Sequence, residues 1–146
     1  MKKINIDLEE TDESSYFYVP PPLNYAIGKV ITKVEHNSEH FTLHWEGGYL
    51  HFFHVSNCCE VVQIESIEGD LTDLFSSLLM CEQVSSENGR VMDYESYTWT
   101  FYKFATVKGY VTVRWLGSSN GYYSESVSWE IYDTLPPEAP DFLDIN

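Results

Sequence analysis

Positive charge is the scarcest property of this sequence. Its 146 residues carry 8 Lys and Arg against 23 Asp and Glu, which gives a formal net charge of -15. This argues against a general affinity for nucleic acid, because such affinity depends on basic side chains that neutralise phosphates. An acidic chain can instead imitate DNA, so an acidic decoy of a DNA-binding protein is one functional alternative.

Long apolar runs are also lacking, and cysteine is rare. No run approaches the roughly 20 apolar residues that span a bilayer. The beginning, MKKINIDLEE, turns acidic before a signal-peptide core could form. With 3 cysteines, two of them adjacent, a secreted disulfide framework is not expected. We therefore expect a protein of the cytoplasm, without membrane association, whose cysteines are all thiols.

Strand-forming residues are plentiful. Hydrophobic residues make up 43% of the chain and aromatic residues 16%, a composition that favours strands over helices. Short runs of Val, Ile, Thr, Tyr, Phe and Trp are separated by Gly, Asn and Ser, which is typical of an antiparallel meander. We expect a mainly β fold, either a sandwich or a partly open barrel. The predicted strands are 27–35, 39–46, 49–55, 59–67, 78–85, 97–107, 110–116 and 122–132.

The chain divides into one domain and two ends. Residues 1–24 form an acidic arm that ends in three prolines, residues 25–132 form a single β-rich domain, and residues 133–146 form a tail rich in Pro and acids. One short helix is predicted at 70–76, where Asp70 can cap the first turn and Asp73 occupies the acidic position of a capping box.

Two hairpins place the candidate binding residues. A turn at Gly47-Gly48 makes His44 and His51 cross-strand neighbours, most simply as an exposed polar pair. A turn at Lys108-Gly109 pairs Lys103 with Arg114, and a four-residue loop at 118–121 sets Glu125 opposite Arg114. The result is a row of two basic residues and one acid, with Trp99 and Tyr123 on the same face. This row is either a structural ion network or the floor of an anion pocket.

The segment HVSNCCE places a histidine, two cysteines and a glutamate close together. His54, Cys58, Cys59 and Glu60 could hold zinc or form a thiol nucleophile, but adjacent strand residues point to opposite faces, and neither a full ligand set nor an orienting group is evident. The simplest interpretation is structural. No phosphate loop, nucleophile elbow or metal-binding helix motif occurs, so we expect no catalytic residues, metal or cofactor.

Several motifs together resemble a known family. They are His54-x-x-x-Cys58-Cys59-Glu60, the run Gly69-Asp70-Leu71-x-Asp73-Leu74, WTFYKFAT and SNGYYSESV, preceded by IGKVITKVE as a first strand. This combination is similar to an uncharacterised family of small bacteriophage and prophage proteins, over roughly residues 27 to 130. The resemblance implies a phage accessory protein that acts inside the infected host. It implies no activity and no catalytic residues.

These observations lead to one main hypothesis and two alternatives. The main hypothesis is a phage-derived, non-enzymatic protein that binds a small anionic ligand, such as a nucleotide, or a host protein, and so counters a host antiviral response. Its binding residues would be Lys103, Arg114, Glu125, Tyr123 and Trp99. The alternatives are a thiol- or metal-assisted hydrolase at His54, Cys58 and Glu60, and the acidic decoy. Exposed aromatic residues are compatible with a homo-oligomer.

Overall fold

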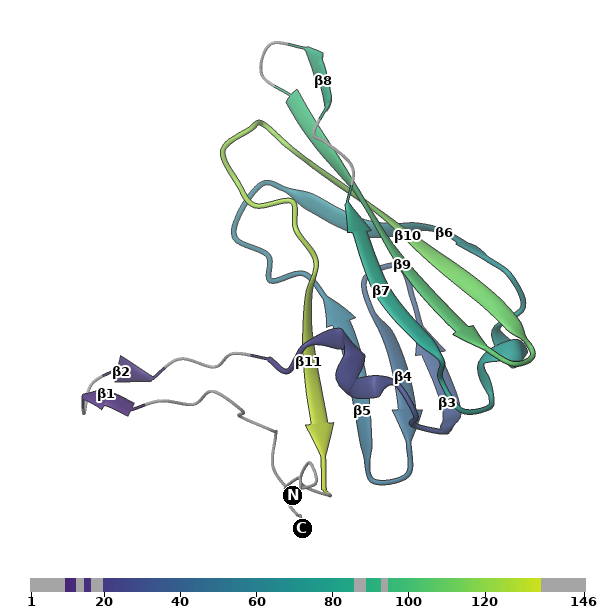
Figure 1. The fold of residues 1–146 in the computed structure, drawn as a ribbon. Coiled ribbons are helices and arrows are strands. Elements are labelled where there is room, and N and C mark those ends of the chain that lie inside the picture. The colour runs from purple at the N-terminus through teal and green to yellow at the C-terminus, as the bar shows by residue number, and fades with distance from the viewer. Residues whose placement is uncertain (1–9, 13–14, 17–19, 86–88, 93–94, 135–146) are drawn as a thin grey trace.

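Two antiparallel sheets face each other in the computed structural model, which describes residues 10–12, 15–16, 20–85, 89–92 and 95–134 (Figure 1). Sheet I has the order β6 (Val61–Glu68), β10 (Gly109–Ser119), β9 (Glu95–Thr106) and β7 (Met80–Ser85), and β8 (Gly89–Met92) also pairs with β9. Sheet II has the order β11 (Ser128–Asp133), β5 (Gly48–Phe53), β4 (Phe41–Trp45) and β3 (Ile31–His36). The predicted mainly β sandwich is confirmed.

The core lies between the two sheets and is strongly aromatic. Alternate residues of β4 and β5 point inward, and Phe41, Leu43, Leu50 and Phe52 are almost completely buried. The ring of Phe41 stacks on that of Phe104 in the opposite sheet, with 5.6 Å between ring centroids. Burial of such large side chains, together with favourable ring geometry, is the main force that holds the sheets together.

The β4–β5 hairpin turns one residue earlier than predicted. Its two-residue turn is Glu46-Gly47, and Trp45 pairs with Gly48. Gly47 supplies the positive φ of 91°, whereas Gly48 lies beside the backbone of Tyr132, where a side chain would collide. His44 therefore faces Tyr49, and the predicted pairing of His44 with His51 is wrong. Because the slip moves each pair by two positions, every side chain stays on the same face of the sheet.

The β9–β10 hairpin differs from the prediction in the same way. Thr106 pairs with Gly109, so that Val107-Lys108 forms the turn. A side chain at Gly109 would lie 2.6 Å from the Asp73 carboxylate, so this glycine serves a close approach to Asp73, whereas the turn itself has no glycine. The register places Lys103 opposite Thr112, and the predicted pairing of Lys103 with Arg114 is wrong.

Helical structure is limited in the described residues to two 3-10 turns, η1 (Leu23–Ala26) and η2 (Leu71–Leu74). The predicted helix at 70–76 is thus a single 3-10 turn. Asp70 caps it as expected, by accepting a hydrogen bond from the Thr72 backbone N–H at 2.9 Å, and Asp73 lies in the first turn. No helix in this part of the chain is long and apolar enough to cross a membrane.

The two ends of the chain are described only in part. In the expected arm, β1 (Glu10–Asp12) pairs with β2 (Ser15–Tyr16), and the chain is described again from residue 20. Of the expected tail, residues 133 and 134 are described and residues 135–146 lie outside the described ranges. The last predicted strand begins later than expected, because residues 122–127 form a loop before β11.

Candidate functional site

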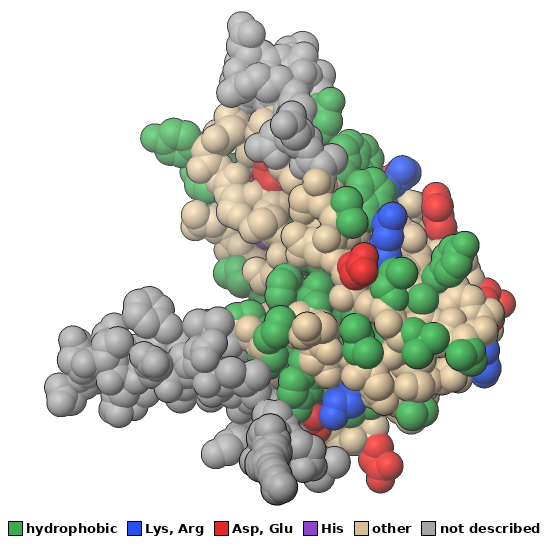
Figure 2. Space-filling view, viewed as in Figure 1, with side chains coloured by type: hydrophobic (Ala, Val, Ile, Leu, Met, Phe, Trp, Pro, Cys, Tyr) green, Lys and Arg blue, Asp and Glu red, His purple; other side chains and the backbone are tan. Residues whose placement is uncertain are grey.

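A polar cavity of about 360 Å³ lies between sheet I and the loop that joins β10 to β11. In Figure 1, β9 and β10 extend past the end of sheet II toward β8, and this loop crosses there from one sheet to the other. The described residues that line the cavity are Gln83, Ser85, Ser96, Thr98, Thr100, Gly121, Tyr123, Ser124, Glu125, Ser126 and Val127. Most carry hydroxyl or amide groups, and Figure 2 shows mainly uncharged polar surface toward this end.

Alternation along β9 produces this polar lining. Successive strand residues point to opposite faces, so Ser96, Thr98 and Thr100 continue the inward row of Tyr102 and Phe104. At the end covered by sheet II the row is aromatic and fully buried. At the other end it carries hydroxyl groups, and these face the loop instead of a second sheet.

Glu125 is the central charged group of the cavity. Its side chain comes from the loop, and the residue is only 8% exposed. Ser96 and Ser119 donate hydrogen bonds to its Oε2 at 2.5 and 2.6 Å, and Thr98 donates to Oε1 at 2.8 Å. The carboxylate thus bonds to both central strands of sheet I and fixes the loop over them.

These hydroxyl groups keep the carboxylate ionised. Burial acts to raise the pKa of Glu125, but the hydrogen bonds from Ser119, Ser96 and Thr98 together outweigh it and hold the pKa below its ordinary value. The three donors are neutral, so the negative charge stays in the cavity at neutral pH.

Glycine in β10 allows the loop to come this close. A Cβ atom at Gly117 would lie 2.5 Å from the backbone oxygen of Glu125 and 2.9 Å from its Cβ. Any side chain at this position would push the loop away from the sheet. The cavity therefore depends on a glycine inside a strand, at a point where the register is otherwise regular.

His54 and Glu60 support the loop from the other side. His54 lies with Nε2 2.7 Å from a Glu60 carboxylate oxygen and Nδ1 2.7 Å from the backbone oxygen of Ser126, which belongs to the cavity wall. Both partners are oxygen atoms, so the His54 ring bridges the Glu60 carboxylate and the backbone of the loop. The contact between His54 and Glu60 thus holds the Ser126 carbonyl.

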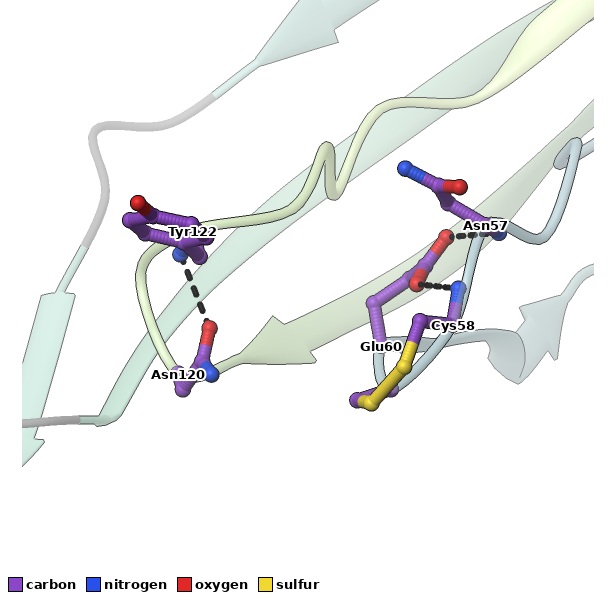
Figure 3. Close-up of a disulfide and its surroundings, with 6 residues drawn as sticks. Asn57, Cys58, Glu60, Asn120 and Tyr122 are labelled. Atoms are coloured by element: carbon purple, nitrogen blue, oxygen red, sulfur yellow. Dashed lines mark hydrogen bonds between the residues drawn. A yellow bond between two sulfur atoms is a disulfide. The ribbon is translucent and has the colours of Figure 1, made fainter.

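Glu60 is itself held by the turn before it. The backbone N–H groups of Cys58 and Asn57 donate to its two carboxylate oxygens at 3.0 and 2.7 Å (Figure 3). These bonds and the contact with His54 lower the pKa of Glu60 to about 2, with the Cys58 N–H as the largest cause. The HVSNCCE segment is therefore an anchoring turn, whose amides converge on one carboxylate.

The cysteines differ from the expectation of three thiols. Cys58 and Cys59 form a disulfide within this turn (Figure 3), and Cys81 is buried with a free thiol. Burial raises the pKa of the Cys81 thiol to about 12. None of the three therefore presents a reactive thiolate in this structure.

A family model described as "Domain of unknown function (DUF7448)" matches residues 24–129 of the chain. The chain belongs to this family. The match includes the anchoring turn, β9, β10 and Glu125, so the cavity is built almost entirely within the DUF7448 domain. Searches of the curated proteins and of the solved structures found no match. Membership of an uncharacterised family is thus confirmed.

The DUF7448 domain does not bring the five predicted binding residues together. Tyr123 and Glu125 line the cavity. Lys103 lies on the outer face of sheet I, in register with Glu82 of β7. The predicted row of Lys103, Arg114 and Glu125 is wrong, because the hairpin register separates the two basic residues and Glu125 lies in a loop on the inner side.

Arg114 and Trp99 also belong to the outer face. The guanidinium of Arg114 donates to a Glu65 carboxylate oxygen at 2.6 Å and lies 4.9 Å from the centre of the Trp99 ring. Figure 2 shows hydrophobic side chains over the face of the DUF7448 domain that is turned toward the viewer, with a few basic and acidic side chains among them. Arg114 is therefore engaged on the surface and does not reach the cavity.

Sequence reasoning missed most of the cavity, although a signal was present. Ser96, Thr98 and Thr100 alternate with three aromatic residues in the stretch SYTWTF. The predicted binding face includes the aromatic Trp99, whereas the hydroxyl side of the strand faces inward. A buried strand face that changes from Phe and Tyr to Ser and Thr indicates an internal polar space.

The remaining motif residues have structural positions. Asp70 and Asp73 belong to the η2 turn, where Thr106 donates a hydrogen bond to the backbone oxygen of Asp73. Among the described residues of the DUF7448 domain, no three His, Cys, Asp or Glu side chains are placed to hold a metal ion together.

Proposed function

We propose that the protein is a non-enzymatic binding protein that holds a small polar molecule in the Glu125 cavity. The observation that carries the proposal is a cavity of about 360 Å³ whose walls are hydroxyl and amide groups around one buried carboxylate. This volume lies within the range of small-molecule sites, which is about 300–1,000 Å³. Several convergent polar groups are what a site needs to orient a hydroxylated ligand.

The cavity favours a neutral or cationic ligand over an anion. The anionic ligand expected from the sequence rested on Lys103 and Arg114, which lie on the outer face. None of the Lys and Arg whose side chains are described lines the cavity. An ionised Glu125 would repel a phosphate, so a nucleotide is a less suitable ligand.

The contacts at the anchoring turn give little support to the hydrolase alternative. Cys58 is joined to Cys59, and Glu60 already accepts two backbone hydrogen bonds and the contact with His54. A nucleophile or general base needs a group that can reach a substrate. These side chains bond to one another and to the loop instead.

The biological setting is part of the proposal. The motif resemblance to phage proteins supports a role in the cytoplasm of an infected host, where sequestering a host molecule would counter an antiviral response.

The acidic decoy receives less support from the described acids. Pairing with basic or His side chains leaves fewer free carboxylates to imitate phosphates, and the paired acids are Glu35, Glu60, Glu65 and Asp133. Binding to a basic protein that weakens steeply with salt would favour the decoy.

Native mass spectrometry, applied directly to lysates of cells that produce the protein, tests this proposal. The wild-type protein is compared with Ser124→Trp, which fills the cavity mouth, and with Ser118→Trp, which adds the same side chain to an exposed site on the opposite face of sheet I. We expect a small-molecule adduct on the wild-type protein and on Ser118→Trp, and its loss from Ser124→Trp.

Two results would contradict the proposal. One is a bare mass for the wild-type protein in lysates of both infected and uninfected cells. The other is an adduct that all three proteins retain equally, since such a molecule would bind outside the cavity. An adduct of nucleotide mass that needs Lys103 or Arg114 would restore the anionic-ligand hypothesis in its original form.

A further inference from the structure

Among the residues whose side chains are described, Glu125 has no cationic partner. Its three hydrogen-bond donors, Ser96, Thr98 and Ser119, are neutral. The described basic side chains lie elsewhere: Lys29 pairs with Asp133, Lys33 with Glu35 and Arg114 with Glu65, and Lys103 and Lys108 are exposed. Buried carboxylates are usually paired with a cation, because hydroxyl donors offset only part of the lost hydration.

The hydrogen bonds leave one defined position for an incoming donor. An ionised carboxylate has about four acceptor positions, two on each oxygen. Oε2 of Glu125 accepts from both Ser96 and Ser119 and is filled, whereas among the described residues Oε1 accepts only from Thr98. One position on Oε1 therefore remains.

This asymmetry selects between two kinds of cation. A guanidinium group gains most when it donates to both carboxylate oxygens at once, which the filled Oε2 prevents. An ammonium group is a compact charge that donates each hydrogen separately. A single position on Oε1 therefore suits an ammonium better than a guanidinium.

The rest of the wall defines the body of the ligand. Beyond Glu125 the cavity presents the Gln83 amide and the hydroxyls of Ser85, Thr100, Tyr123 and Ser124. Gln83 already bonds to Ser85 and Tyr102, and Ser124 bonds to Ser126. An alkyl chain would leave the remaining donors and acceptors of the wall unused. A body with several hydroxyl groups would satisfy them.

We propose that the cavity recognises a small hydroxylated primary amine, such as an amino sugar, whose ammonium group donates to Oε1 of Glu125. This inference rests on the proposed function and specifies its ligand class. The ammonium supplies the missing countercharge, and the hydroxyls of the body bond to the Ser, Thr and Gln groups of the wall. Affinity should depend on the positive charge and weaken moderately with salt, since the pair is partly screened.

Titration of the full-length protein with two matched sugars tests the inference. D-glucosamine and D-glucose differ at one position, where the first carries an ammonium group and the second a hydroxyl. By calorimetry or NMR shift mapping we expect D-glucosamine to bind at least about tenfold more tightly, as one charge-assisted hydrogen bond provides. In Glu125→Gln the preference should disappear, while circular dichroism shows an unchanged fold.

A second variant tests the same charge without removing it. Ser85 is exposed and lies at the cavity wall, so Ser85→Lys introduces a tethered ammonium that can reach Glu125. We expect this variant to have a higher Tm than the wild-type protein and to lose D-glucosamine binding. Ser118→Lys on the opposite face adds the same charge and should change neither property.

The outcomes separate this inference from the proposed function. Equal binding of the two sugars, or a preference that survives in Glu125→Gln, overturns the inference, and so does an absence of any D-glucosamine binding. The proposed function survives these results if the lysate adduct is still lost from Ser124→Trp. It fails with the inference if that adduct is also missing.

Discussion

The two ends of the inward row of β9 share one strand and one sheet face but differ in what covers them. Tyr102 and Phe104 lie under sheet II and are at most 1% exposed. Ser96, Thr98 and Thr100 lie under the loop between β10 and β11 and surround the cavity. The aromatic end stabilises the sandwich by burying apolar surface, whereas the polar end gains little from burial and keeps an ionised carboxylate. The residues that stabilise the fold and the residues that form the cavity thus occupy different ends of the same inward face of β9.

Removal of an aromatic ring at the covered end should have the largest effect. Phe104 is completely buried and contacts the rings of Phe41 and Phe52. We expect Phe104→Ala to lower the free energy of unfolding by about 3–5 kcal/mol, because it leaves a cavity that the two sheets cannot close. Chemical denaturation followed by tryptophan fluorescence measures this.

Thr100→Ala is the matched control at the polar end. It shortens Thr100, which lies four residues before Phe104 on the same inward face of β9 and is 4% exposed. We expect a loss of about 1 kcal/mol or less, since one hydroxyl contributes little net stability. If Thr100→Ala destabilised the protein as much as Phe104→Ala, the polar end would be part of the structural core and the division would be wrong.

The predictions from the sequence were right where apolar burial sets the pattern and wrong where distant segments of the chain approach each other. Alternation predicted the strands 39–46 and 49–55, which correspond to β4 and β5, because apolar burial repeats with a period of two. The predicted pairing of Lys103 with Arg114 is wrong because Gly109 is not a turn residue, and Glu125 is misplaced because residues 122–127 form a loop. Gly48 and Gly109 serve close approaches by distant segments, namely Tyr132 and Asp73, and such tertiary contacts are not visible in a local pattern.

The Glu60 anchor was equally hard to foresee. Its carboxylate collects two backbone N–H groups and His54, and His54 in turn reaches a loop 72 residues away along the chain. The motif marked the residues without indicating their partners. The short sequence spacing suggested a metal or thiol site, whereas the bonds made are structural.

A side chain in β10 at the polar end should have the next largest effect. Gly117→Ala places a methyl group 2.5 Å from the Glu125 backbone oxygen, so the loop must move. We expect a loss of about 1–3 kcal/mol in stability, as for other overpacked sites, together with loss of small-molecule binding. Denaturant unfolding and the native mass spectrum measure the two effects.

The exposed neighbour Ser118 provides the control for this change. Ser118→Ala alters the outer face of the same strand and should leave both stability and binding unchanged. An unchanged cavity in Gly117→Ala would show that the loop does not depend on close contact with β10. The loop would then be held mainly by His54 and the three hydroxyl groups on Glu125.

Mild acid should weaken the polar end before the aromatic end. The pKa of Glu60 is about 2 in the folded protein, against an ordinary value of 4.5. As the pH falls below 4.5 the unfolded chain takes up this proton first, so the stability that the anchor contributes is present above that pH and is lost progressively toward pH 2. Amide hydrogen exchange at residues 120–127 should rise in this range while the strands under sheet II stay protected.

Glu60→Gln isolates the contribution of this one carboxylate. The variant keeps an acceptor oxygen but does not titrate, so its denaturation midpoint should fall less steeply with acid than that of the wild-type protein. Glu68→Gln, at an exposed site in β6, should follow the wild-type curve. Parallel curves for all three proteins would mean that the Glu60 anchor does not set the acid response. The loop would then depend on Glu125 itself, whose lowered pKa gives the same direction of change.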